Sequence, residues 1–175
     1  MVDANKIKLI LLDCDGVLTD GAIIYNENRV ETKNFSAKDG LGIRLVMNMG
    51  IEVAVITGRQ SELLAQRCAD LRITRLYQHV RNKLEVAEEL IRELGLTWEN
   101  VAAMGDDWND MPMLEKAGIS LTPADAFPDV RARVDLVTER EGGKGAVREL
   151  IEWILKGQNR YEEAVESLLD RFMAQ

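Results

Sequence analysis

The chain has 175 residues, 46% of them hydrophobic and 30% charged, and its 22 basic and 30 acidic residues give a formal net charge of −8. This length and composition suit one soluble globular domain, and the acidic balance argues against nucleic acids and anionic membranes as partners. Cys14 and Cys68 lack CxxC or zinc-ligand spacing, no apolar stretch reaches membrane-spanning length and no signal peptide is recognisable, so we expect a cytoplasmic protein.

Apolar runs along the chain are expected to be strands. The runs at 7–12, 51–56 and 101–104 are nearly continuous, which is typical of strands buried on both faces of a sheet. Shorter runs indicate further strands at 76–77, 119–121 and 136–137.

Helical patterns separate these runs. Apolar residues recur at spacings of three and four in the segments 41–49, 63–71, 84–94 and 147–154, and a terminal helix is expected over 161–172. Strands that alternate with helices predict an α/β fold, a Rossmann-like parallel sheet with helices on both faces. We expect a single domain over residues 1–175.

One segment breaks the alternation. Residues 22–25 and 29–33 flank a polar turn and are expected to form a β-hairpin that protrudes from the main sheet. Ile23, Ile24 and Tyr25 are consecutive, so their apolar groups point to both faces. Either the hairpin folds back on its own domain, or another subunit covers it.

Acidic residues follow the first and third long runs. Asp13 and Asp15 stand directly after the first, where two buried carboxylates are costly unless a cation or hydrogen bonds compensate. Asp106, Asp107 and Asp110 follow the third, and alone would fit a solvated turn in which Asp110 caps the next helix. Because parallel strands bring their carboxyl ends to one edge, we expect the two groups to meet there and to suit Mg²⁺.

Two further polar positions belong to the same edge. Thr57 and Gly58 follow the second long run, where a hydroxyl and backbone amides can bind a phosphate oxygen, although an ordinary helix cap has the same pattern. Lys83 begins a helix, where the dipole disfavours a cation. It is either a functional group or a solvated surface charge.

Together these motifs resemble the haloacid-dehalogenase superfamily over nearly the whole chain. DCDGVLTD at 13–20, Thr57, Lys83 and GDDWND at 105–110 stand in the order found there. Other strings are similar to a capless subfamily of phosphatases that act on eight-carbon sugar-acid phosphates in lipopolysaccharide precursor synthesis: FSAKDGLGI at 35–43, VITGR at 55–59, LYQ at 76–78, NK at 82–83 and GGKGAVRE at 142–149.

The resemblance implies a role for each site residue. Asp13 would attack phosphorus and form an aspartyl-phosphate, and Asp15 would protonate the leaving oxygen and then deprotonate water. Thr57 and Lys83 would hold the transferring oxygens. Mg²⁺ would be held by Asp13, the backbone carbonyl of Asp15 and Asp106, while Asp107 and Asp110 would orient these ligands and Lys83.

The resemblance also implies how a substrate is chosen. The intervals between Asp15, Thr57 and Lys83 hold no room for a cap domain, and capless relatives form homotetramers in which one subunit's hairpin covers the neighbour's site. Positions that match the substrate contacts are Asp15, Ser36, Ala37, Lys38, Asp39, Gly40, Arg44, Gly58, Arg59, Arg67 and Lys83. Arginines suit a small molecule that carries both phosphate and carboxylate.

Some alternatives stay open at this point. A nine-carbon sugar-acid phosphatase is the nearest, but those relatives tend to carry Glu where this chain has Arg59. A phosphomutase would need a cap to exclude water, and a non-catalytic oligomeric scaffold would not need the acidic motifs intact. The GGKGAVRE segment is either a simple loop into the last helices or an approach to the site that brings Lys144 and Arg148.

Overall fold

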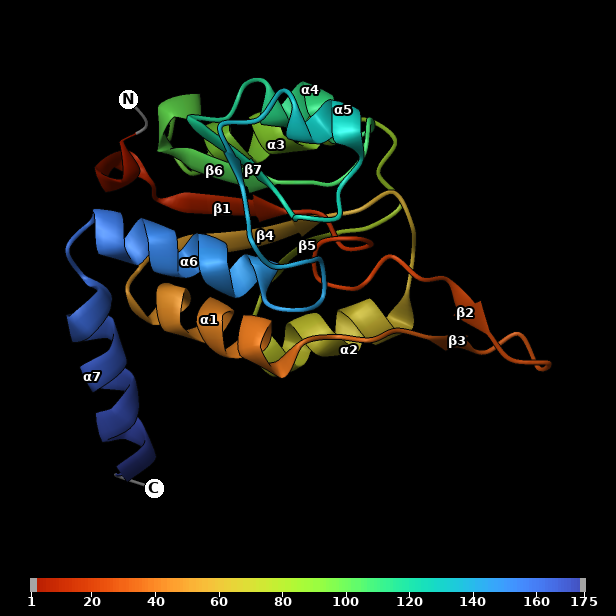
Figure 1. Ribbon diagram of the computed structural model, residues 1–175, viewed down its shortest axis with the longest axis horizontal. Coiled ribbons are helices and arrows are strands. Elements are labelled where there is room, and N and C mark those ends of the chain that lie inside the picture. The colour runs from red at the N-terminus through yellow and green to blue at the C-terminus, as the bar shows by residue number, and fades with distance from the viewer. Residues whose placement is uncertain (1–2, 174–175) are drawn as a thin grey trace.

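The computed structural model describes residues 3–173, and its centre is a six-stranded sheet of order β5-β4-β1-β6-β7-β8 (Figure 1). Every neighbouring pair in this sheet is parallel, which confirms the predicted fold class. The strands are β1 Leu9–Leu12, β4 Glu52–Ile56, β5 Arg75–Tyr77, β6 Val101–Met104, β7 Ile119–Thr122 and β8 Leu136–Val137. Each overlaps one of the runs expected from the sequence.

Helices cover both faces of the sheet (Figure 1). On one face lie α1 Ala37–Asn48, α2 Glu62–Leu71 and α6 Ala146–Gly157, with α7 Tyr161–Met173 packed against α1 and α6. On the other lie α3 Lys83–Glu93, α4 Met111–Leu114 and α5 Pro128–Arg131. Short 3₁₀ turns at Ala4–Lys6 and Trp98–Asn100, like α5, were not predicted because they are too short to show a helical period.

Side chains of the central strand alternate between two hydrophobic cores. Leu9 and Leu11 pack with α3 and α4, whereas Ile10 and Leu12 pack with α1 and α6, and all four are fully buried. A strand covered on both faces needs apolar residues at every position. The continuous run before Asp13 therefore follows from the central place of β1.

The strand order reverses at β1. Its neighbours are β4 on one side and β6 on the other. The chain passes from β1 to β4 and β5, and then returns to form β6 on the other side of β1. Ligands of such sheets bind outside the carboxyl ends of the strands at this reversal. Asp13 follows β1 at that point.

A second, two-stranded sheet forms the expected hairpin, with β2 Ile24–Tyr25 antiparallel to β3 Glu31–Thr32. Figure 1 shows that it projects beyond the main sheet. Four of its apolar side chains are 42–58% exposed: Ile23, Ile24, Tyr25 and Val30. Within one chain the hairpin therefore does not bury these apolar side chains.

Across residues 3–173, no helix combines the length and the apolar character needed to cross a bilayer. Both cysteines are free thiols, and both are buried.

Candidate active site

A cavity of about 260 Å³ opens at the carboxyl ends of β1, β4 and β6. Residues of the motifs that follow the three long strands line it together, whereas Lys83 is not among the lining residues. Its lining residues are Asp13, Asp15, Gly21, Thr57, Gly58, Arg59, Asp106, Asp107 and Asn109.

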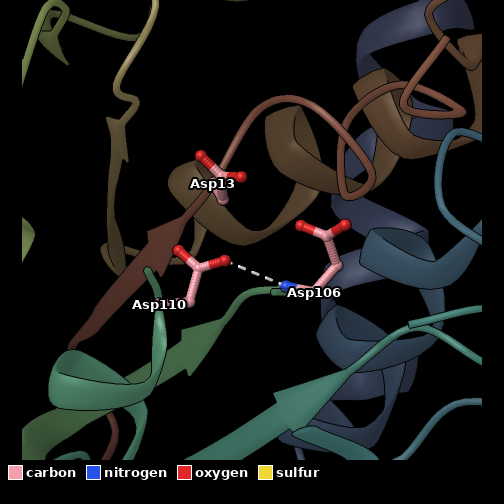
Figure 2. A group of neighbouring side chains, drawn as sticks. All are labelled: Asp13, Asp106 and Asp110. Carbon is pink, nitrogen blue, oxygen red and sulfur yellow. Dashed lines mark hydrogen bonds between the residues drawn. The ribbon is translucent and has the colours of Figure 1, made fainter. Parts of the chain in front are cut away.

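Three neighbouring carboxylates lie at this site, as Figure 2 shows, and two of them, those of Asp13 and Asp106, line the cavity. Oxygen atoms of Asp13, Asp106 and Asp110 all lie within 4.8 Å of one another. Asp13 and Asp110 are only 5% and 0% exposed. Carboxylates packed this closely out of water repel one another unless a cation lies among them.

Asp110 stands at the N-cap position of α4, but its side chain makes no capping bond to that helix. Its Oδ2 instead accepts hydrogen bonds from the backbone amides of Asp106 (3.0 Å) and Asp107 (3.3 Å). The N-cap position considered from the sequence is therefore confirmed, but the solvated turn is wrong, because Asp110 is buried and its side chain does not cap the helix. Asp110 fixes the turn that presents Asp106.

Lys83 lies between two of these carboxylates. Its Nζ is 2.6 Å from both Asp13 Oδ1 and Asp110 Oδ1, and its side chain is 3% exposed. Burial alone would lower the pKa of Lys83, but the charges of Asp13 and Asp110 raise it above its ordinary value. The solvated surface charge considered from the sequence is wrong, and the ion pairs outweigh the unfavourable dipole at the start of α3.

One lysine does not balance this cluster. Burial, followed by the charge of Asp110, raises the pKa of Asp13 to about 7, and burial with the charge of Asp13 raises that of Asp106 to about 8. Hard oxygen ligands with excess negative charge fit a divalent cation such as Mg²⁺. The donor set of this chain therefore suits the metal expected from the sequence.

Gly16 allows the loop after β1 to approach Asp106. Its φ is +88°, and a Cβ at this position would overlap the Asp106 carboxylate. A side chain here would be strained by the backbone and would displace a carboxylate of the cluster. The glycine of the DxDG string is thus needed for its lack of a side chain.

The Asp15 carboxylate lies apart from the three clustered ones. It forms ion pairs with Lys33 and, at 3.8 Å, with Arg59 Nε, and its side chain is 20% exposed. Sequence reasoning missed Lys33 and its neighbour Glu31. Glu31 and Lys33 stand two positions apart in the expected hairpin strand 29–33, so their side chains share one face. That spacing was the available signal for a charged cluster on the hairpin.

Thr57 is buried at the end of β4 and lines the cavity. Its backbone amide donates to Tyr77 O (2.9 Å), and its hydroxyl oxygen accepts from the Arg59 amide (3.4 Å). These bonds fix the residue at the same edge as Asp13.

Of the expected substrate contacts, Asp15, Gly58 and Arg59 line the cavity, and Lys83 lies behind it. The others lie at the N-cap of α1, along α1 and on α2, outside the lining of this cavity in a single chain: Ser36, Ala37, Lys38, Asp39, Gly40, Arg44 and Arg67.

Several of this second group have partners within the chain. Ser36 caps α1 by accepting from the Asp39 amide, and its carbonyl accepts from Arg67. The buried Asp39 carboxylate accepts from the amides of Gly145 and Arg148 at the start of α6. Asp39 thus joins α1 to α6.

The GGKGAVRE segment packs against the nucleophile loop. Gly143 donates its amide to Val17 O (3.0 Å), and a Cβ on Gly142 would overlap Gly16 O. Lys144 and Arg148 pair with Glu141 and Glu152, outside the lining of the cavity. In this chain the segment supports the loop after β1 through its backbone, and both of its expected basic groups have other partners.

Known proteins resemble this chain over almost all of its length. Residues 71–150 match the model of a haloacid dehalogenase-like hydrolase family. The chain is 47% identical to 3-deoxy-D-manno-octulosonate 8-phosphate phosphatase KdsC of Escherichia coli (strain B / BL21-DE3), over 94% of this chain and 87% of that protein. The chain belongs to the KdsC family of haloacid dehalogenase-like phosphatases.

Solved structures of the KdsC family share the fold. The Moraxella catarrhalis phosphatase, solved with magnesium, phosphate and KDO, superposes with a TM-score of 0.92 at 38% identity, covering 95% of each chain. The cobalt-bound Haemophilus influenzae enzyme gives a TM-score of 0.87 at 40% identity, covering 91% of this chain and 93% of the other.

Proposed function

We propose that this chain is a Mg²⁺-dependent phosphatase that converts 3-deoxy-D-manno-octulosonate 8-phosphate to the free sugar acid and phosphate, a step of lipopolysaccharide precursor synthesis. The observation that carries the proposal is the meeting of Asp13, Asp15, Thr57 and Asp106 around one cavity at the end of the central strand. Similarity to KdsC proteins supports the choice of substrate.

Asp13 is the nucleophile in this proposal. One carboxylate oxygen forms a bond to phosphorus while the bond from phosphorus to the sugar's O8 breaks, which leaves an aspartyl-phosphate. Lys83, 2.6 Å from Asp13 Oδ1, restrains that carboxylate. Thr57 lies on the cavity wall, where its hydroxyl can hold a phosphoryl oxygen.

Asp15 exchanges the proton. It donates one to O8 as the sugar leaves, and its carboxylate then takes a proton from the water that attacks the aspartyl-phosphate. Phosphate and a regenerated Asp13 carboxylate result. The two half-reactions run in opposite directions, so one group serves both.

Asp13, Asp106 and the backbone carbonyl of Asp15 would hold Mg²⁺, with Asp107 and Asp110 orienting them. When bound, the ion supplies positive charge that lowers the repulsion between a carboxylate and an anionic phosphate. The excess of negative charge among Asp13, Asp106 and Asp110 supports this assignment.

Arg59 favours an acidic sugar as the substrate. It is the arginine that lines the cavity beside Asp15, and its guanidinium can bind the carboxylate of a sugar acid. The remaining expected contacts lie on or next to α1 and α2, and they include Arg44 and Arg67. They would bind the substrate where two subunits meet.

The assembly and the location are part of the same proposal. The exposed apolar hairpin supports a homotetramer in which it covers the site of a neighbouring subunit. We also propose a single hydrolase domain over 1–175 and a cytoplasmic protein.

The test is a screen of phosphorylated sugar acids with Mg²⁺ present and absent. We expect the eight-carbon 8-phosphate to be preferred, activity to be lost with a chelator, and Asp13→Asn to lower kcat by at least about 10³-fold while the fold persists. Preference for a nine-carbon 9-phosphate would overturn the substrate. Activity that survives Asp13→Asn would overturn the mechanism.

A further inference from the structure

The base of the hairpin places a second charged group beside the cavity. We call it the hairpin-base cluster: Asp15, Glu31, Lys33 and Arg59, with two negative and two positive charges. Lys33 pairs with Asp15 and lies 3.6 Å from Glu31 Oε1, and Arg59 Nη2 lies 2.7 Å from the same Glu31 oxygen. The motifs of the sequence assign no role to Lys33.

We propose that Lys33 is a positioning residue for the hydrolysis, which holds the Asp15 carboxylate so that its free oxygen faces the leaving group. This inference rests on the proposed function because it takes Asp15 as the group that exchanges the proton. It adds a residue of the hairpin to the machinery of the reaction.

Burial supports a specific role for Lys33. The residue as a whole is half-buried, but its side chain is only 2% exposed, and lysine side chains so shielded from water are almost always paired. Its ammonium has two carboxylate partners, Asp15 and Glu31, which restrain it together.

The two oxygens of Asp15 have different surroundings. Oδ1 accepts from Lys33 Nζ, whereas Oδ2 lies 3.8 Å from Arg59 Nε, which is beyond hydrogen-bond distance. Asp15 lines the cavity, and no donor among the described residues bonds its Oδ2, so Oδ2 is the oxygen free for a reacting group. Acid–base catalysis is sensitive to such placement, because a shift of about 1 Å can cost about 10²-fold in rate.

Glu31 holds this arrangement in place. Besides its contacts with Lys33 and Arg59, it accepts from Ser61 Oγ (2.6 Å), and Ser61 stands at the N-cap of α2. Lys33 is thus restrained by a carboxylate that is itself bonded to the main domain. The hairpin is therefore tied to the acid–base residue within a single subunit.

The test compares two phosphate esters in Lys33→Met, which removes the ammonium and keeps much of the chain. A sugar ester needs a proton on its leaving oxygen, whereas 4-nitrophenyl phosphate has a leaving group that is stable as an anion. In single-turnover release of the alcohol, we expect the sugar ester to slow about 10- to 100-fold and the nitrophenyl ester by less than about threefold.

Controls separate this result from general damage. Lys116→Met removes a half-exposed lysine that pairs with Glu88, and both esters should then react as in the wild type. An equal slowing of both esters in Lys33→Met, or no slowing of either, overturns the proposal. The wild type could instead hydrolyse another alkyl phosphate and not the sugar-acid phosphate. The proposed substrate would then be wrong, but the role of Lys33 would still be tested by comparing that alkyl phosphate with 4-nitrophenyl phosphate.

A second variant covers a failure of Lys33→Met to fold. Asp15→Asn with Lys33→Met removes both members of the ion pair, so neither charge is left buried alone. The proposal expects the residual rate of this double variant on the alkyl ester to match that of Asp15→Asn. If the rate of the double variant were about 10-fold below that of Asp15→Asn, Lys33 would act independently of Asp15. That result would overturn the positioning role.

Discussion

At the scale of single residues, the folded chain disfavours the ionised form of Asp106, and a bound cation would relieve this cost. Burial and the charge of Asp13 raise its pKa from 3.8 to about 8. Below pH 4 the carboxyl is protonated in both the folded and the unfolded chain. As the pH rises, the unfolded chain ionises first, so this residue lowers the free energy of unfolding progressively between about pH 4 and about pH 8.

The variant Asp106→Asn tests this sign. Asparagine has a similar shape and cannot ionise, so in the absence of metal the variant should melt about 2–5 °C above the wild type at pH 8 and close to it at pH 4. Thermal melts by circular dichroism in a chelator measure this. Added Mg²⁺ should raise the Tm of the wild type at pH 8 and leave the variant unchanged; a lower Tm of the metal-free variant at pH 8 would contradict the charge argument.

At the scale of elements, two loops from distant parts of the chain pack closely against each other. The loop after β1 carries Asp13 and Asp15, and the glycine segment before α6 packs on its backbone. Because a Cβ on Gly142 would overlap Gly16 O, the close approach of these loops depends on a missing side chain. The position of the nucleophile thus depends on residues more than half the chain away.

Gly142→Ala should therefore lower kcat by about 10- to 100-fold, since even a small displacement of the nucleophile loop disturbs the reacting geometry. Steady-state kinetics with the sugar-acid phosphate measures the loss. The matched control is Gly95→Ala, where φ is +65° and no atom lies within 4 Å of the added Cβ. It should cost about 1 kcal/mol of stability and leave kcat unchanged; equal kcat in the two variants would contradict the packing argument.

How far the sequence predicts these elements depends on the range of the interactions. The strands β1, β4 and β6 were predictable because burial on both faces makes their runs continuous, and parallel topology then brings Asp13, Thr57 and Asp106 to one edge. The pairing of Lys33 with Asp15 was not, since a local pattern does not say which side chains meet across a turn. The contact of Gly142 with Gly16 likewise depends on tertiary packing, so the meaning of the GGKGAVRE string stayed open.

At the scale of the whole molecule, the hairpin connects the reaction to the proposed assembly. Its residues Lys33 and Glu31 contact Asp15 and Arg59, while its apolar side chains Ile23, Ile24 and Val30 are exposed. A single chain thus leaves the cavity without a cap and the apolar side chains of the hairpin without a cover. One contact between subunits would cover the cavity and bury the apolar side chains of the hairpin at the same time. The apolar surface, which is unfavourable in water, would then form a wall of the neighbour's site.

Replacing Ile24 and Val30 together by Asp places charges on the exposed apolar surface of the hairpin and should prevent such contacts. We expect the wild type to have the mass of a tetramer and the variant a smaller mass, with turnover of the sugar-acid phosphate reduced about 10-fold or more as the cover is lost. Light scattering after size-exclusion chromatography measures the mass, and phosphate release measures turnover. Val137→Asp, on the exposed side chain of edge strand β8, is the control and should change neither. A monomeric wild type with full activity, or a variant that remains tetrameric, would contradict the role of the hairpin in completing the site.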